Sequence, residues 1–191
     1  MPRFTRAELQ TYRDAVVPDL LGPDLRLLFV GINPGLWTAA TQTHFASPSN
    51  RFYPALYAAG IIEEPLSPSD GMTDADRDML RARGIGLTNI VRRATARADE
   101  LSRTELRAGA VELEATVRRT APRVVAILGI TAYRTAFDAR AAVPGRQPGD
   151  LAGAELWVVP NPSGLNAHET AASLAVAYAE AARAAGVLAG A

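Results

Sequence analysis

The stretch LLFVGINPGLWTAATQTHFASPSNRFYPAL, residues 27–56, decides the fold of this chain. Its first four residues are apolar and are typical of a buried strand. The next five residues, GINPG, break regular structure with two glycines and a proline, and they enclose Asn33. A helical pattern follows at 51–59. A buried strand, a tight loop and a helix in this order are typical of one unit of an α/β fold.

The same alternation continues along the chain. Short apolar runs predict buried strands at 27–30, 86–91, 124–128 and 156–159, and amphipathic patterns predict helices at 6–17, 51–59, 74–83, 103–120, 131–137 and 169–185. Strands separated by helix-length crossovers imply a mostly parallel sheet with right-handed connections. We therefore expect a three-layer α/β/α sandwich around a four-stranded sheet. The turn-rich segments 65–71 and 143–153 are expected to be loops.

The composition indicates one domain. The chain has 191 residues, of which 48% are hydrophobic, and it can bury one sizeable core. We expect a single domain over residues 1–191, with its core at about 25–186 and a preceding helix at 6–17. The chain shows neither a run of 18 apolar residues nor the apolar centre of a secretory signal. We therefore expect a monomer in the bacterial cytoplasm or nucleoid, with no membrane partner.

Missing residue types exclude several kinds of chemistry. The chain has no cysteine, which excludes disulfides, cysteine-ligated zinc, iron–sulfur clusters and a thiol nucleophile. Its two histidines, His44 and His168, are too few for a histidine-rich metal site. All 20 basic residues are arginine, so no lysine side chain can form an imine. Covalent amine chemistry would need the N-terminus, which we expect the helix at 6–17 to hold away from the site.

The residues that follow each strand should form the site, because ligands of such sheets bind outside the carboxyl ends of the strands. Two of these segments place Asn directly before Pro: Asn33-Pro34 after the first strand and Asn161-Pro162 after the fourth. Each pair alone is typical of an ordinary turn, whereas two stiffened loops at one rim indicate a binding cleft. No dinucleotide or triphosphate motif follows the first strand. We expect no cofactor and no metal.

Five motifs occur in the order GINPGL, SPSNRFYPALYAAG, GIGLTNIVRRAT, LSRTELRAGA and NPSGL. In this order they resemble the mismatch-specific uracil/thymine-DNA glycosylase family of the uracil-DNA glycosylase superfamily. The resemblance implies the α/β/α sandwich expected above. It also implies a monofunctional glycosylase of base excision repair that acts on double-stranded DNA. Such a hydrolase flips uracil, and in some cases thymine or another damaged pyrimidine, out of a G·U or G·T mismatch and hydrolyses the N-glycosidic bond.

The resemblance assigns roles around the pyrimidine. Asn33 is the catalytic residue, because its side-chain oxygen would hold the attacking water. An amide takes no proton at neutral pH, so positioning must supply most of the rate. Phe45 would stack on the extruded base, with a place in the core as the alternative. The other substrate-binding residues that we predict are Gly31, Ile32, Pro34, Thr38, Asn89 and Asn161.

The resemblance also implies that the loop after the fourth strand contacts DNA. Leu165 would be the wedge that fills the gap in the duplex, with Ser163, Gly164 and Asn166 beside it. A helix-start contact between Leu165 and Leu174 is the alternative.

Two arginines and one alanine stand at positions that the resemblance relates to DNA binding. Arg92 and Arg93 would bind phosphates beside the lesion, or else they belong to a solvated loop. Arg92 replaces an acidic residue seen in relatives, and Ala167 stands where relatives commonly carry Arg. The resemblance therefore does not carry over the relatives' recognition of the opposite base or their hold on the distorted duplex.

Two other classes of protein fit the sequence less well. A catalytically weak DNA-damage-binding protein on the same fold would bind DNA but release no base. An α/β hydrolase with a catalytic triad is poorly supported, because the chain has no G-x-S-x-G motif. Release of uracil from a duplex in the presence of a chelator separates the three classes.

Overall fold

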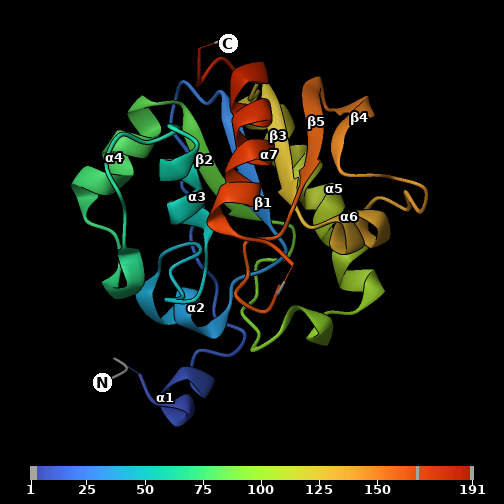
Figure 1. The fold of residues 1–191 in the computed structure, drawn as a ribbon. Coiled ribbons are helices and arrows are strands. Elements are labelled where there is room, and N and C mark those ends of the chain that lie inside the picture. Colours follow the sequence, from blue (N-terminus) through green and yellow to red (C-terminus); the bar gives the residue numbers. More distant parts are fainter. Residues whose placement is uncertain (1–3, 167, 190–191) are drawn as a thin grey trace.

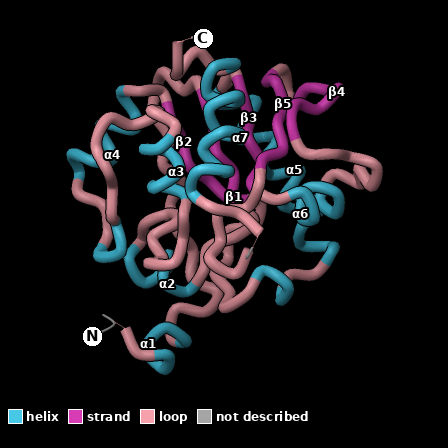
Figure 2. The backbone as a smooth tube through the Cα atoms, viewed as in Figure 1, coloured by secondary structure: helices cyan, strands magenta, loops and turns pink. Residues whose placement is uncertain are grey.

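The computed structural model describes residues 4–166 and 168–189. At its centre is a five-stranded sheet in the order β2-β1-β3-β5-β4. The strands are β1 (Leu27–Gly31), β2 (Ile85–Asn89), β3 (Val124–Leu128), β4 (Gly145–Leu151) and β5 (Ala154–Val159). All strands except β4 run parallel, and β4 pairs antiparallel with β5. Helices cover both faces of the sheet (Figure 1, Figure 2), so the predicted sandwich around a mostly parallel sheet is confirmed.

The prediction of four strands is wrong by one strand. Residues 143–153, expected to be a loop, contain β4, which forms a hairpin with β5 at the sheet edge. The sequence hides this strand because Pro148 and Gly149 lie inside it. An edge strand tolerates proline, whose missing N–H costs no ladder bond on the open side. The pairing register also shifts between Arg146 and Asp150, where the strand is irregular.

The α-helices of the described residues are α1 (Arg6–Gln10), α2 (Leu36–Thr41), α3 (Phe52–Ala58), α4 (Asp74–Ala82), α5 (Arg103–Thr120), α6 (Ile130–Ala136) and α7 (Ala171–Ala184), with short 3₁₀ turns η1 (Pro68–Asp70) and η2 (Ala98–Glu100). The pair α3 and α7 packs on one face of the sheet, and the pair α5 and α6 packs on the other (Figure 1). Within the described part of the chain, no helix has the length and apolar character needed to cross a membrane.

Alternate side chains of β1 build the two halves of the core, as the two-residue period of a strand requires. Leu27 and Phe29 belong to the buried cluster under α3 and α7, which includes Tyr178. Leu28 and Val30 belong to the cluster under α5 and α6. Every residue of β1 is buried. The unbroken apolar run LLFV therefore identifies a strand that is covered on both faces.

The N-terminal helix is shorter than predicted. α1 begins with a capping box between Thr5 and Glu8 and ends at Gln10 instead of residue 17. Asp14 has a φ of +63°, a left-handed conformation that a helix cannot contain. Its N–H donates to the Ala94 carbonyl at 2.9 Å. This contact with the segment after β2 places α1 next to α2, on the side of the molecule toward which the carboxyl ends of β1 and β2 point (Figure 1).

Candidate active site

A cleft of about 990 Å³ lies at the carboxyl ends of the parallel strands. The segments that follow β1, β2, β3 and β5 all contribute to its walls. The predicted site residues that line it are Gly31, Ile32, Asn33, Pro34, Thr38, Phe45, Asn89, Asn161, Ser163, Leu165 and Asn166. Both Asn-Pro loops thus face one cleft.

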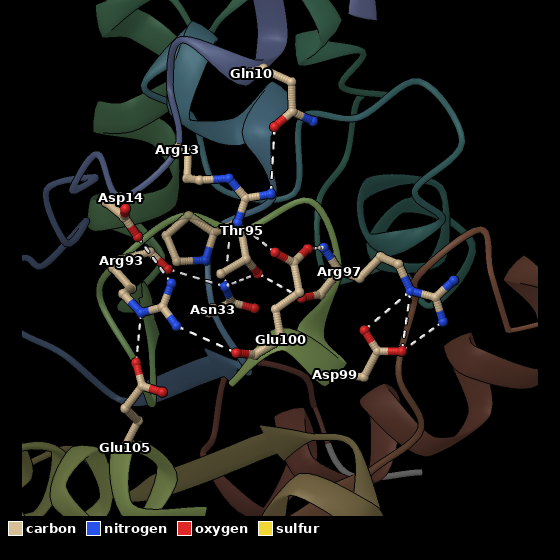
Figure 3. Close-up of polar contacts among 11 residues, drawn as sticks. Gln10, Arg13, Asp14, Asn33, Arg93, Thr95, Arg97, Asp99, Glu100 and Glu105 are labelled. Atoms are coloured by element: carbon tan, nitrogen blue, oxygen red, sulfur yellow. Dashed lines mark hydrogen bonds and ion pairs between the residues drawn. The ribbon is translucent and has the colours of Figure 1, made fainter. Parts of the chain in front are cut away.

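Asn33 is held in place by its side-chain nitrogen. The two protons of Nδ2 face three acceptors: the Thr95 hydroxyl at 2.7 Å, the Arg93 carbonyl at 3.0 Å and the Pro34 carbonyl at 3.2 Å, so one proton is shared (Figure 3). The Thr95 hydroxyl donates its own proton to the Arg97 carbonyl at 2.7 Å. It can therefore only accept from Asn33. Because all three partners of Nδ2 are acceptors, the network fixes which end of the amide is nitrogen.

The side-chain oxygen of Asn33 is left available. Within residues 4–166 and 168–189 no donor reaches Oδ1, and the half-buried Asn33 lines the cleft. The groups that hold the nitrogen are themselves fixed, since Thr95 is 1% exposed and the Thr95 N–H donates to the Pro34 carbonyl at 3.1 Å. An oriented amide oxygen in a half-buried cleft is suited to accept a hydrogen bond from one water.

Gly31 allows two other cleft residues to approach the end of β1. A Cβ at this position would collide with Asn89 Oδ1 and would lie 3.1 Å from the Phe45 ring. Phe45 stacks on Phe52, with ring centroids 4.2 Å apart and an angle of 30° between the planes. Phe45 also has a φ of +58°, which is rare for an aromatic residue. It thus packs against the core and lines the cleft at the same time.

His44 orients the side chain of Asn89. The His44 Nε2 lies 3.0 Å from the Pro18 carbonyl, so this nitrogen carries the proton. His44 Nδ1 is then an acceptor, and it lies 3.1 Å from Asn89 Nδ2. Burial lowers the pKa of His44 and keeps the ring neutral at neutral pH. The Asn89 oxygen is consequently directed toward Gly31 at the floor of the cleft.

The loop after β5 presents an apolar side chain to solvent. Leu165 is 82% exposed, whereas Leu174 is fully buried, so the alternative of a helix-start contact is not seen. The loop is braced from within, because Asn161 Oδ1 accepts from the Ser163 N–H at 3.0 Å and Asn166 Nδ2 donates to the Asn161 carbonyl at 3.1 Å. A rigid loop that exposes a leucine is suited to insertion into a duplex. Ala167 lies outside the described residues.

Arg51, which the sequence analysis did not single out, ties this loop to the rest of the cleft. Its Nη1 donates to the carbonyls of Ser163 at 3.2 Å and Asn166 at 3.1 Å, and its N–H donates to the Pro162 carbonyl at 3.0 Å. Gly164 lies against Ser49, where a Cβ would come within 2.6 Å of the serine Cβ. Gly164 is therefore needed for close packing of the two loops, although it does not itself line the cleft.

Arg92 and Arg93 are committed to ion pairs. Arg92 binds Asp19 at 2.7 Å, and Arg93 binds Asp14 at 2.9 Å and Glu105 at 2.6 Å. The Arg93 guanidinium, followed by contacts at the Ser102 cap, lowers the pKa of Glu105 to about 2. Among the described residues that line the cleft, neither arginine is found. The phosphate contacts expected of these two arginines stay a prediction, and the backbone carbonyl of Arg93 has a separate role, since it accepts from Asn33 Nδ2.

Other cleft residues escaped the sequence analysis. Arg97, to which the sequence analysis gives no role, lines the cleft together with Asp99, and the two side chains pair at 2.6 Å. The contact with Arg97 lowers the pKa of Asp99, so this carboxylate is ionised. The helix α1 contributes Arg6 and Gln10 to the cleft wall. The N-terminal amine, which we expected this helix to hold away from the site, lies outside the described residues. The helix itself borders the cleft, because it ends early and the chain folds back.

The possible metal ligands of the described residues do not form a cluster. In the described ranges, no group of three or more His, Asp or Glu side chains is placed to hold an ion.

Comparisons with known proteins agree with this geometry. Residues 18–182 match the family model described as the Uracil DNA glycosylase superfamily. A solved structure, the solution NMR structure of a "putative Uracil DNA glycosylase" from Methanosarcina acetivorans, has the same fold, with a TM-score of 0.56 and 17% sequence identity over 86% of this chain and 98% of that chain. The family match spans both Asn-Pro loops and every strand. The chain therefore belongs to the uracil DNA glycosylase superfamily.

Proposed function

We propose that this protein is a monofunctional DNA glycosylase that removes uracil from G·U mismatches in double-stranded DNA. Thymine in G·T mismatches and other damaged pyrimidines are further candidate substrates, and the protein would act in base excision repair. The observation that carries the proposal is the fixed amide of Asn33, whose nitrogen has three acceptors and whose oxygen is free in the cleft.

The reaction begins with removal of the base from the stack, which costs roughly a few kcal/mol and less for a mispaired base. The extruded pyrimidine would lie against Phe45, with Ile32 and Asn89 at its edge and Leu165 in the space that it left. Positive charge then develops on the sugar and negative charge on the departing base. A water held by Asn33 Oδ1 adds to the sugar carbon as the bond to the base breaks. The bonding pair leaves with the base, and the proton that the water loses passes through solvent to the departing base anion. Positioning and electrostatics supply the rate, because the amide removes no proton.

A uracil-release assay tests the proposal. Duplexes with uracil opposite each normal base are incubated with the protein in the presence of a chelator and then treated with alkali. We expect alkali-dependent breaks at uracil, fastest for the G·U duplex. Salt-sensitive binding without any break would instead favour a catalytically silent damage-binding protein. Equal rates on all four opposite bases would contradict the proposed mismatch specificity but not the glycosylase activity.

Thr95 is expected to act as a positioning residue for Asn33. Thr95→Val keeps the side-chain shape but removes the acceptor for Asn33 Nδ2 and the donor for the Arg97 carbonyl. Since one hydrogen bond is worth about 1 kcal/mol, the single-turnover rate should fall by roughly 3- to 10-fold. Affinity for the duplex should not change.

Two other threonine variants are the controls for Thr95→Val. Thr95→Ser keeps the hydroxyl and should restore most of the rate. Thr116→Val alters another buried threonine, on α5 and outside the cleft lining, and should leave the rate unchanged. If Thr95→Ser is as slow as Thr95→Val, the hydroxyl is not what orients Asn33.

The lack of lysine predicts an intact abasic strand as the product. Strand cleavage by a glycosylase needs an amine that forms an imine with the sugar, and no side chain here offers one. We expect borohydride to trap no protein–DNA adduct, with breaks only after alkali. Because α1 lies beside the cleft, a chain with an acetylated N-terminus is the necessary control. The α-amino group of the N-terminus is the other amine of the chain, and residues 1–3 lie outside the described residues. A strong adduct that acetylation abolishes would overturn the monofunctional assignment.

A further inference from the structure

A second concave surface adjoins the cleft. This basic hollow, of about 440 Å³, is lined by Arg103, Arg107, Arg134, Thr135, Asp138 and Arg140. It lies between the beginning of α5 and the end of α6, two helices that pack side by side (Figure 1). Its four arginines and one aspartate leave a net charge of three positive units at neutral pH. The chain as a whole has no net charge, so this is a local concentration of positive charge.

The arginines of the basic hollow are largely unneutralised. Arg107 pairs with Asp138 at 3.2 Å. Arg134 donates from Nε and Nη2 to the Ala142 carbonyl at 2.9 and 2.6 Å, which orients its guanidinium without cancelling the charge. Arg103 and Arg140 are exposed, and neither side chain makes an ion pair or hydrogen bond within the part of the chain that the structure describes. The hollow thus offers free N–H donors and charge to an anion.

Three separate segments join the basic hollow to the cleft. Each segment has one residue in the wall of the cleft and another, three or four positions away, in the wall of the hollow. The pairs are Asp99 and Arg103, Thr131 and Arg134, and Pro144 and Arg140, with the cleft residue first. Three residues of α-helix span about 5 Å, and four residues of any chain span at most about 14 Å. Phosphates of one strand repeat every ~3.4 Å along the axis of the duplex. The hollow therefore begins within about four phosphates of a nucleotide that occupies the cleft.

We propose that the basic hollow binds backbone phosphates of the duplex that flanks the damaged base. The inference rests on the proposed function, because it takes the cleft as the place of the extruded nucleotide. It extends the DNA-binding surface from the cleft and the Leu165 loop to the side of the molecule formed by α5 and α6. It also supplies cations that Arg92 and Arg93, held in ion pairs, do not.

The test uses a duplex with a tetrahydrofuran abasic analogue opposite guanine, and the double variant Arg103→Gln/Arg140→Gln. Each lost phosphate contact should lower the slope of log Kd against log salt by about 0.9, so we expect a decrease of about 1 to 2. Affinity at low salt should fall by roughly 10-fold. Arg118→Gln/Arg119→Gln, in the last turn of α5, makes the same change in net charge and should leave affinity and slope unchanged.

Neutral methylphosphonate linkages then locate the contact. Substituted one at a time within about five nucleotides on each side of the lesion, they should weaken the parent protein at one to three positions and leave the double variant unaffected there. Unchanged affinity and slope in the double variant, equal effects of both double variants, or no methylphosphonate position that distinguishes parent from variant would each overturn the inference. Uracil release by the parent protein is measured separately, so a failure of the hollow and a failure of the proposed function remain distinguishable.

Discussion

Asn33→Ala should reduce the single-turnover rate of uracil release by about 100-fold or more, while the affinity for a mismatched duplex stays near that of the parent. The change removes the only free side-chain oxygen of the Asn33 network and leaves Thr95 and the carbonyls of Pro34 and Arg93 in place. The Leu165 loop and the basic hollow are untouched. Rapid-quench measurements on a G·U duplex with enzyme in excess give the rate, and fluorescence anisotropy with a tetrahydrofuran duplex gives the affinity.

A second variant tests whether the loss of rate is specific to Asn33 or follows the removal of any polar group from the cleft. Asp99→Asn removes an ionised carboxylate from the cleft wall and keeps the side-chain size. If water is positioned by Asn33, Asp99→Asn should retain most of the rate. Parental release of uracil by Asn33→Ala, or a larger loss in Asp99→Asn than in Asn33→Ala, would show that Asn33 does not hold the water. Thermal melting of both variants checks that the fold is retained.

Leu165→Ala should reduce excision from an A·U pair by roughly 10-fold or more and excision from a G·U mismatch by only about 3-fold. A wedge replaces stacking and pairing that are lost when the base leaves, and a well-paired uracil loses more of both. Leu165 contributes little to the core, because its side chain is 82% exposed. The stability of the protein should therefore not change. Single-turnover rates on the two duplexes, taken as a ratio, measure the effect.

Val176→Ala is the matched control for the wedge. Val176 is another exposed apolar residue, 66% accessible, on α7 and outside the cleft lining. Its loss should change neither rate. Equal losses on A·U and G·U in Leu165→Ala would mean that the leucine contributes to general binding and not to base extrusion.

Local patterns predicted the parts of the fold that depend on burial and chain breaks. The LLFV run identified β1, and GINPG identified the loop that carries Asn33. The same rules failed at β4, because Pro148 and Gly149 are typical of loops and only pairing with β5 makes them part of a strand. They also extended α1 beyond Gln10, since the amphipathic pattern continues while Asp14 adopts a left-handed conformation to reach Ala94.

For the site too, local motifs could be predicted and contacts between distant parts of the chain could not. Asn33 and Leu165 were recognisable because each stands in a short motif, and Phe45 because it lies just before one. Thr95 and Arg51 were not, since their importance comes from contacts 62 and more than 100 residues away along the chain. Arg93 was assigned to DNA because charge is visible in a sequence, whereas its ion-pair partners are chosen by the fold.

Both edges of the sheet are interrupted as templates for a further strand. On one side the Leu20 N–H and carbonyl bond to Leu87 of β2, at 2.9 and 2.8 Å. On the other side Pro148 lacks an N–H and the register break of β4 interrupts the row of free backbone groups. A sheet without a continuous open ladder resists edge-to-edge aggregation. The irregular β4 hairpin thus offers a second copy of the chain no continuous ladder for adding a strand, while the cleft lies at the carboxyl ends of the parallel strands, away from this edge.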